Sequence, residues 1–150
     1  EAYSLKHGPN DNFGQEAIDE ILKFMEDHRH DMVVIFAGYH KEMRTFLETN
    51  SGLASRVPNT FDFEDYTSEE IGQIGLYELA SDSLTVDEEA YRQAVATAYA
   101  RTNDRSNGRW IRNFNEKLRL RLATRFGNNP SIDPNQIIQQ DLDDVLAMLK

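Results

Sequence analysis

The chain has 150 residues, of which 39% are hydrophobic and 28% are charged. This length suits one domain or two small lobes, and a chain of this length can bury a core without disulfide bonds. Cysteine is absent, which excludes disulfides, a cysteine nucleophile and thiolate metal sites and fits a reducing, cytoplasmic compartment. The formal net charge of −10 disfavours nucleic acid or an anionic membrane as a partner.

The first elements in chain order alternate between helix and strand. Apolar residues at helical spacing predict a helix over 13–28, and Asn12 with Gln15 resembles a capping box at its start. The apolar, β-branched run over 32–37 is typical of a strand buried on both faces of a parallel sheet, and it is too short to cross a bilayer. A short helix over 41–48, a loop over 49–52 and a strand over 60–63 follow.

After Asp65 the pattern indicates helices only. Thr67 and Glu70 form a second capping box, and Asp87 or Thr85 caps the next helix. A long helix over 109–126 carries a basic face that we expect to be exposed, formed by Lys117, Arg119, Arg121 and Arg125. A short helix around 142–149 ends the chain. A sheet of two strands is too small to stand alone, so we expect residues 1–65 to be the remnant of a larger α/β sheet and 66–150 a helical bundle.

Three residues stand out as candidates for chemistry. Glu1 opens the chain, Arg56 lies between a predicted helix and a predicted strand, and Arg109 begins a predicted helix. An isolated loop arginine is usually a solvated charge. An arginine in the first turn of a helix, however, opposes the helix dipole, which favours an anionic ligand beside Arg109.

Seven segments together resemble one family. They are EAYSL at 1–5, FGQEAI at 13–18, MEDHR at 25–29, VVIFAGY at 33–39, NSGLASR at 50–56, FEDYT at 63–67 and NGRWIRN at 107–113. In this order they are similar to the CbxX/CfqX-type AAA+ ATPases. That group includes stage V sporulation protein K ATPases, red-type Rubisco activases and ATPases of type VII secretion.

The resemblance implies a fold and a set of roles. Residues 1–65 would be the C-terminal part of an α/β P-loop core and 66–150 a helical lid. Glu1 would match the Walker B acidic residue that polarises the attacking water. Arg56 would be the arginine finger that reaches the neighbouring subunit's γ-phosphate, and Arg109 the sensor-2 arginine. ATP and Mg²⁺, a hexameric homo-oligomeric ring and a protein client are implied for the full-length protein, with no nucleic acid or membrane partner.

The sequence departs from the family pattern in several ways. No G-x-x-x-x-G-K-[ST] phosphate loop is present, so we expect this fragment alone to be inactive. Position 54 is Ala where relatives often have a second arginine. The segment Ala37-Gly38-Tyr39 replaces the usual Asn, so no sensor-1 residue is assigned. Residues 6–12 suit either a second pore loop or a plain surface loop.

Other interpretations stay open at this stage. His28, His30 and His40 suggest a zinc site, but a helix C-terminus also favours such side chains without a metal. The basic face over 117–125 suggests nucleic-acid binding, which the net charge disfavours. The main alternative to an ATPase is a non-catalytic helical module that docks other proteins.

Overall fold

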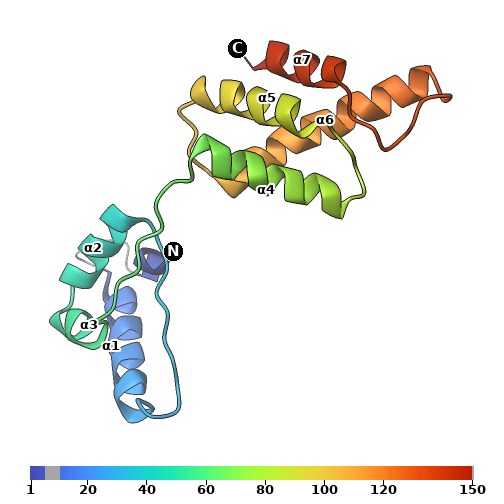
Figure 1. Cartoon of the computed structure of the whole chain (residues 1–150). Helices are drawn as coiled ribbons and strands as arrows, with labels where there is room; N and C mark the ends of the chain where they lie inside the picture. Colours follow the sequence, from blue (N-terminus) through green and yellow to red (C-terminus); the bar gives the residue numbers. More distant parts are fainter. Residues whose placement is uncertain (6–10, 150) are drawn as a thin grey trace. The chain divides into compact units, whose positions relative to one another are not determined.

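The computed structural model describes residues 1–5 and 11–149 (Figure 1). Two compact units divide the chain, Glu1–Phe63 and Glu64–Lys150. The pore-loop interpretation of 6–12 falls mostly on residues 6–10, which lie outside the described ranges, whereas Asp11 and Asn12 belong to the start of a helix. No helix of the described residues is both long enough and apolar enough to cross a membrane.

The first unit is built from short helices around a small core. A 3₁₀ turn, η1 (Ala2–Leu5), precedes the helices α1 (Asn12–Asp27), α2 (His40–Glu48) and α3 (Ser51–Arg56). Both η1 and α3 pack against α1 and α2 (Figure 1). Ile18, Phe46 and Leu53, one from each α-helix, are fully buried at the centre of this unit. The unit therefore holds together through three helices rather than through a sheet.

The predicted α/β fold with parallel strands is wrong for the described residues, which form helices and no strand. Residues 32–39 have no regular secondary structure. Ala2 N donates to Ala37 O at 2.9 Å, and at the two ends of the segment Met32 N donates to His28 O at 3.1 Å and Met43 N donates to Tyr39 O at 2.8 Å. Residues 60–63 also have no regular secondary structure and are exposed. A strand exists only through hydrogen bonds to a neighbour. An apolar run indicates the extended backbone but cannot supply that neighbour.

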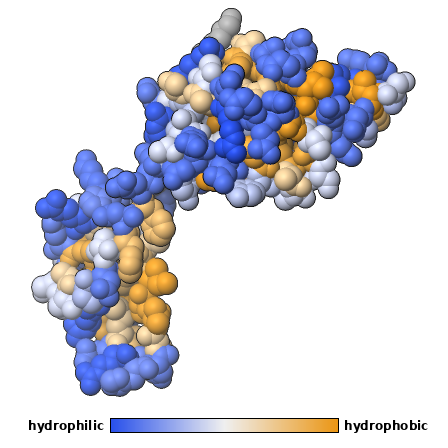
Figure 2. Space-filling view, viewed as in Figure 1, coloured by the Kyte–Doolittle hydropathy of each residue, from blue (hydrophilic) through white to orange (hydrophobic). Residues whose placement is uncertain are grey.

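The segment 32–37 alternates instead between packed and open side chains. Phe36 is half-buried and lies with its ring centroid 5.8 Å from that of Phe46. Val33 and Ile35 point the other way and are 85% and 84% exposed. Figure 2 shows apolar surface over the extended segment that follows α1. The expectation of burial on both faces is therefore wrong, because one face alone meets the unit's core.

Two local predictions in this unit also need correction. Asp11 rather than Asn12 caps α1, since the Asp11 carboxylate accepts a hydrogen bond from Gly14 N at 2.9 Å. The predicted loop over 49–52 is partly helical, because Asn50 Oδ1 accepts a hydrogen bond from Gly52 N at 2.8 Å and so starts α3. Arg56 consequently ends a helix and does not lie in a loop.

The second unit is a bundle of four helices, α4 (Ser68–Ser81), α5 (Glu88–Ala100), α6 (Gly108–Asn128) and α7 (Gln139–Met148). α4 packs on α5 and α6, and α7 packs on the same two helices (Figure 1). The predicted capping box is confirmed: Glu70 N donates to Thr67 Oγ1 at 3.3 Å, and Thr67 N donates to Glu70 Oε2 at 2.9 Å. Asp87 caps α5 by accepting from Ala90 N at 2.8 Å.

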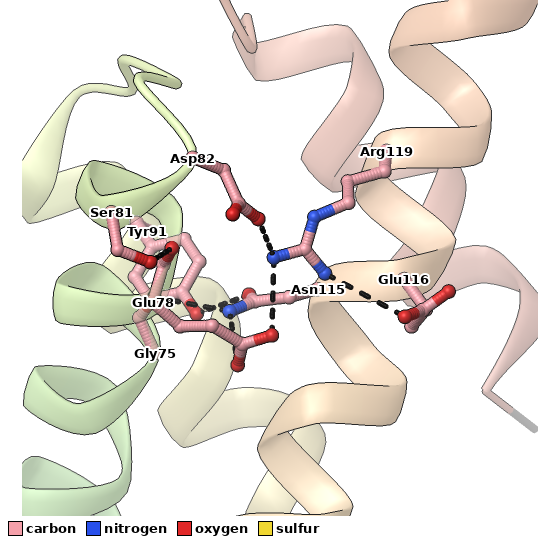
Figure 3. Close-up of polar contacts among 8 residues, drawn as sticks. All are labelled: Gly75, Glu78, Ser81, Asp82, Tyr91, Asn115, Glu116 and Arg119. Carbon is pink, nitrogen blue, oxygen red and sulfur yellow. Dashed lines mark hydrogen bonds and ion pairs between the residues drawn. The ribbon is translucent and has the colours of Figure 1, made fainter.

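A polar network crosses the core of this bundle (Figure 3). The fully buried Asn115 of α6 accepts a 2.6 Å hydrogen bond from the Tyr91 hydroxyl and donates to Gly75 O at 3.0 Å. Its amide also donates to Glu78 Oε2 at 3.3 Å, and Arg119 donates to Glu78 Oε1 at 3.1 Å. Each buried polar atom of Asn115 thus has a partner, as a stable core requires.

Gly75 makes this network possible because it leaves room for a close approach of helices. A Cβ atom at position 75 would lie 2.0 Å from the Tyr91 hydroxyl and 2.6 Å from Ile111 Cγ1. Real Cβ atoms do not approach heavy atoms so closely. The glycine therefore lets the Tyr91 ring lie directly against the backbone of α4.

Candidate functional site

Glu1 lies at the start of the first unit with its side chain exposed. Its backbone carbonyl accepts hydrogen bonds from Ser4 N at 3.0 Å and Ser4 Oγ at 2.7 Å, which fixes the beginning of η1. Partial burial, and then a hydrogen bond with Glu1, raises the pKa of the Tyr3 hydroxyl. The Glu1 carboxylate is thus held beside a protonated phenol and remains open to solvent.

Arg56 ends α3 and its side chain is directed at α1. Arg56 Nη2 lies 3.1 Å from Glu26 Oε2, near the end of α1. The other oxygen of the same carboxylate, Glu26 Oε1, lies 3.6 Å from Arg29 Nη1. One carboxylate is therefore shared by two guanidinium groups, and the cluster formed by Glu26, Arg29 and Arg56 carries one net positive charge.

A cavity of about 330 Å³ adjoins this cluster. Its wall is mixed, with charged side chains at one part and apolar side chains elsewhere. The residues that line it are Met25, Glu26, Arg29, Met32, Val34, Arg56, Val57, Pro58 and Asn59. Its volume is at the lower end of the range found for small-molecule sites. The predicted arginine finger therefore borders a concave, positively charged surface of the first unit.

Arg109 lies in the first turn of α6 in the second unit, with its side chain exposed. No carboxylate within the described residues forms an ion pair with it. The hydrogen bond from Ser106 N, at 2.8 Å, lowers the pKa of Asp104, and the charges of Arg109 and Arg105 lower it further. The charge of Arg109 thus reaches Asp104, while its side chain stays open to solvent.

The N-terminus of α6 lacks a side-chain cap. Asn107 has a φ of 54°, and its side chain accepts from Tyr66 N at 3.0 Å and donates to Asp65 at 2.9 Å instead of capping its own helix. Helix N-termini without a cap attract anions through their N–H groups and the helix dipole. Together with Arg109, this end of α6 is suited to bind a phosphate group.

The three predicted residues are divided between the two units. Glu1 and Arg56 belong to the first unit, and no hydrogen bond or ion pair joins them among the described residues. Arg109 belongs to the second unit. The roles of all three therefore remain predictions that follow from the resemblance.

Sequence reasoning did not single out Glu26 as the partner of Arg56. A glutamate there carries no distinguishing signal, since its partner Arg56 is 30 positions further along the chain. The predicted basic face over 117–125 also differs from expectation. Arg119 pairs with Glu78 and Asp82, and Arg125 forms two hydrogen bonds with the buried Asp141. Two of its four charges are thus internally compensated.

The three histidines that the structure describes have separate partners, and His30 Nε2 accepts a hydrogen bond from Arg29 Nε at 3.1 Å. His28 Nδ1 lies 3.5 Å from Asp31 Oδ1, and His40 Nδ1 lies 3.0 Å from Asp62 Oδ1. Among the residues that the structure describes, no three His, Cys, Asp or Glu side chains gather where they could hold a metal ion. Glu1 alone does not make a Mg²⁺ site, so the residues present support no catalytic step through the metal.

Comparison with known proteins gives consistent matches over most of the chain. A CfxQ homolog from Galdieria sulphuraria is 36% identical over 97% of the chain. Stage V sporulation protein K from Bacillus subtilis (strain 168) is 39% identical over 78% of it. The chloroplastic ribulose bisphosphate carboxylase/oxygenase activase from Cyanidioschyzon merolae is 39% identical over 87% of it. The chain belongs to the CbxX/CfqX-type AAA+ family. No family model matches it.

This AAA+ chain spans half or less of the length of these curated relatives, with 50%, 38% and 45% of each covered. Within it, two cationic positions are suited to phosphate oxygens. One is Arg56 beside the cavity, and the other is Arg109 at the uncapped end of α6.

Proposed function

We propose that this chain is part of an ATPase that couples ATP hydrolysis to the remodelling of a protein client, within a hexameric homo-oligomeric ring in the cytoplasm. The single observation that supports this most is the state of Arg56. It is a helix-end arginine beside a cavity, neutralised only by a half-exposed glutamate that it shares with Arg29. Membership of the AAA+ family supports the use of nucleotide.

In the proposed reaction Arg56 acts across a subunit boundary. Transfer of the γ-phosphoryl group of ATP to water spreads negative charge over the phosphoryl oxygens. A guanidinium group presents planar donors that match those oxygens and stabilises this charge. Because Arg56 would serve the neighbouring subunit's ATP, hydrolysis would depend on assembly. Glu1 would hold and polarise the attacking water.

Arg109 would serve the nucleotide of its own subunit. Its place in the first turn of α6 puts a side-chain cation and the uncapped backbone N–H groups at the same helix end. Since α6 packs against α4 and α7, a displacement of Arg109 by the nucleotide would move the whole helical unit. The helical unit would thereby act as a lid that responds to nucleotide state.

The nature of the client is supported only in general terms. The relative from Cyanidioschyzon merolae is, by its name, an activase of ribulose bisphosphate carboxylase/oxygenase, which is itself a protein. The relative from Bacillus subtilis is named for sporulation. These names support a protein client and do not choose between clients.

The test is a pair of substitutions in the full-length protein. Arg56→Ala should lower ATP turnover under assembling conditions by about a thousandfold, the loss expected for an arginine finger. Arg109→Ala should weaken nucleotide binding as well as turnover. Steady-state ATPase assays and nucleotide titrations measure the two effects.

Matched controls are available in each unit. Arg44→Ala removes an exposed arginine of α2 that pairs with Glu48, and Arg112→Ala removes an exposed arginine of α6 in the turn after Arg109. Both should leave turnover near the wild-type value. Wild-type turnover in both Arg56→Ala and Arg109→Ala would contradict the proposal and favour a non-catalytic docking module.

A further inference from the structure

The guanidinium group of Arg56 is folded back along its own helix. A Cβ atom built on Gly52, one turn earlier in α3, would lie 3.6 Å from Arg56 Nη1. Helical side chains lean toward the N-terminus, so a residue four positions later naturally covers this place. While Nη1 lies over Gly52, Nη2 is bound to Glu26 of α1. Arg56 is therefore held against the body of its own unit.

A competing anion can replace Glu26 as the partner of Arg56. The side chains of Arg56 and Glu26 are 37% and 52% exposed, so water and solutes reach the pair. Glu26 also faces Arg29 at 3.6 Å, and its single charge cannot neutralise two guanidinium groups. A triphosphate carries more negative charge than one carboxylate, and charge-assisted bonds from arginine to phosphate are strong. A triphosphate can thus displace Glu26 from Arg56.

We propose that Glu26 is a latch on Arg56: it retains the guanidinium group in the unassembled subunit and releases it when the neighbouring subunit presents ATP. This inference rests on the proposed finger role of Arg56. The latch binds the candidate finger of an unassembled subunit to its own α1. Assembly therefore requires an exchange in which the Arg56–Glu26 pair breaks and an arginine–phosphate contact forms.

The latch has a modest and measurable effect. Exposed ion pairs stabilise a conformation only weakly, so the released state is a substantial minority in the wild type. An interaction that needs this minority state is weakened by the fraction of molecules that populate it. Removing the latch should therefore lower the subunit concentration needed for activity and leave the assembled ring's own rate unchanged.

The experiment measures ATP turnover per subunit as a function of protein concentration in the full-length protein. Glu26→Gln keeps the shape of the side chain and removes its charge. It should lower the half-saturating subunit concentration by about twofold to fivefold, the range set by one exposed ion pair. The maximal turnover per subunit should stay at the wild-type value. Glu26→Ala should behave in the same way.

The matched control is Glu48→Gln, which removes the same charge from another exposed ion pair of the same unit, that of Arg44 on α2. It should leave the half-saturating concentration unchanged. An unchanged or higher half-saturating concentration in Glu26→Gln, or a lower maximal turnover, would overturn the latch. Arg56→Ala distinguishes the arginine-finger role of Arg56 from the latch role of Glu26. Loss of turnover in Arg56→Ala would support the finger role whatever the result for Glu26. Wild-type turnover in Arg56→Ala would contradict both roles.

Discussion

Individual buried polar residues carry much of the specificity of the helical unit. Asn115 joins three helices, because its amide contacts Tyr91 of α5 and Gly75 and Glu78 of α4 (Figure 3). Burial raises the pKa of Tyr91, so its hydroxyl keeps its proton and remains a donor at every pH of practical interest. A satisfied network of this kind selects one packing of the helices over others.

Tyr91→Phe tests this network. It removes the hydroxyl and leaves Asn115 Oδ1 without its donor in a buried place, so the free energy of unfolding should fall by about 1–3 kcal/mol. Urea denaturation followed by circular dichroism measures the change. Tyr77→Phe is the control, because Tyr77 is exposed and its hydroxyl only accepts a 3.3 Å bond from Gln73. It should change stability by less than about 0.5 kcal/mol.

The same residues show where sequence reasoning ends. Helical spacing grouped Arg119 with Lys117, Arg121 and Arg125 on one basic face of its helix. It could not show that Arg119 meets Glu78, because that partner lies 41 positions away on another helix. Glu26 was missed for the same reason. Patterns along one helix predict which side chains face inward, whereas pairs between helices depend on the packing itself.

At the scale of elements, local hydrogen bonds decide where helices begin. The capping box at Thr67 was predictable because both partners lie within four residues of each other. Hydrogen bonds from the backbone and then the side chain of Thr67 lower the pKa of Glu70 below its ordinary value of 4.5. The ionised form of Glu70 thus stabilises the folded state above pH 4.5, and this contribution is lost as the pH falls through the lowered pKa.

Glu70→Gln tests this dependence on pH. The stability of the wild type should decline as the pH falls from 4.5 toward the lowered pKa of Glu70, and Glu70→Gln should decline less steeply over that range. Thermal unfolding measured at a series of acidic pH values gives both curves. Glu69→Gln removes a neighbouring charge of the same first turn outside the box, and its curve should keep the wild-type steepness. Equal slopes for the two variants would contradict the assignment.

Strands were harder to predict than helices because a strand is not a local structure. The run over 32–37 is rich in β-branched residues, which favour strands, yet it forms no strand. Its expected sheet is missing, because no second strand is formed among the described residues. At Asn50 the sequence reasoning failed in the other direction, because it predicted a loop where a helix begins. The Asn50 side chain accepts a hydrogen bond from Gly52 N, two residues later, and so caps α3. This short-range pattern was available in the sequence but was interpreted as a loop.

At the scale of the whole molecule, the two units have separate cores. The buried cluster of the helical unit is drawn from positions between Ile71 and Val145, and that of the first unit from Ile18, Phe46 and Leu53. A unit with its own core can fold by itself. The family resemblance supplied the candidate arginines from sequence, but their local surroundings emerged only from the folded structure.

The segment 64–150 expressed alone should therefore fold. We expect the helical circular dichroism of a bundle and a cooperative urea transition whose midpoint matches that of the helical unit in the longer chain. Residues 1–63 make a natural comparison, because their buried cluster is smaller and they should be less stable alone. A non-cooperative or absent transition for 64–150 would show that its core needs further support.

The absence of a side chain at position 75 has a consequence for natural variation. A methyl group there would clash with the phenol at position 91, so the residue at one position limits the residue allowed at the other. Among relatives of this chain, alanine or serine at the first position should appear together with a residue smaller than tyrosine at the second. The amide oxygen of Asn115 would then lose its donor, whereas the amide nitrogen would keep its acceptors on α4.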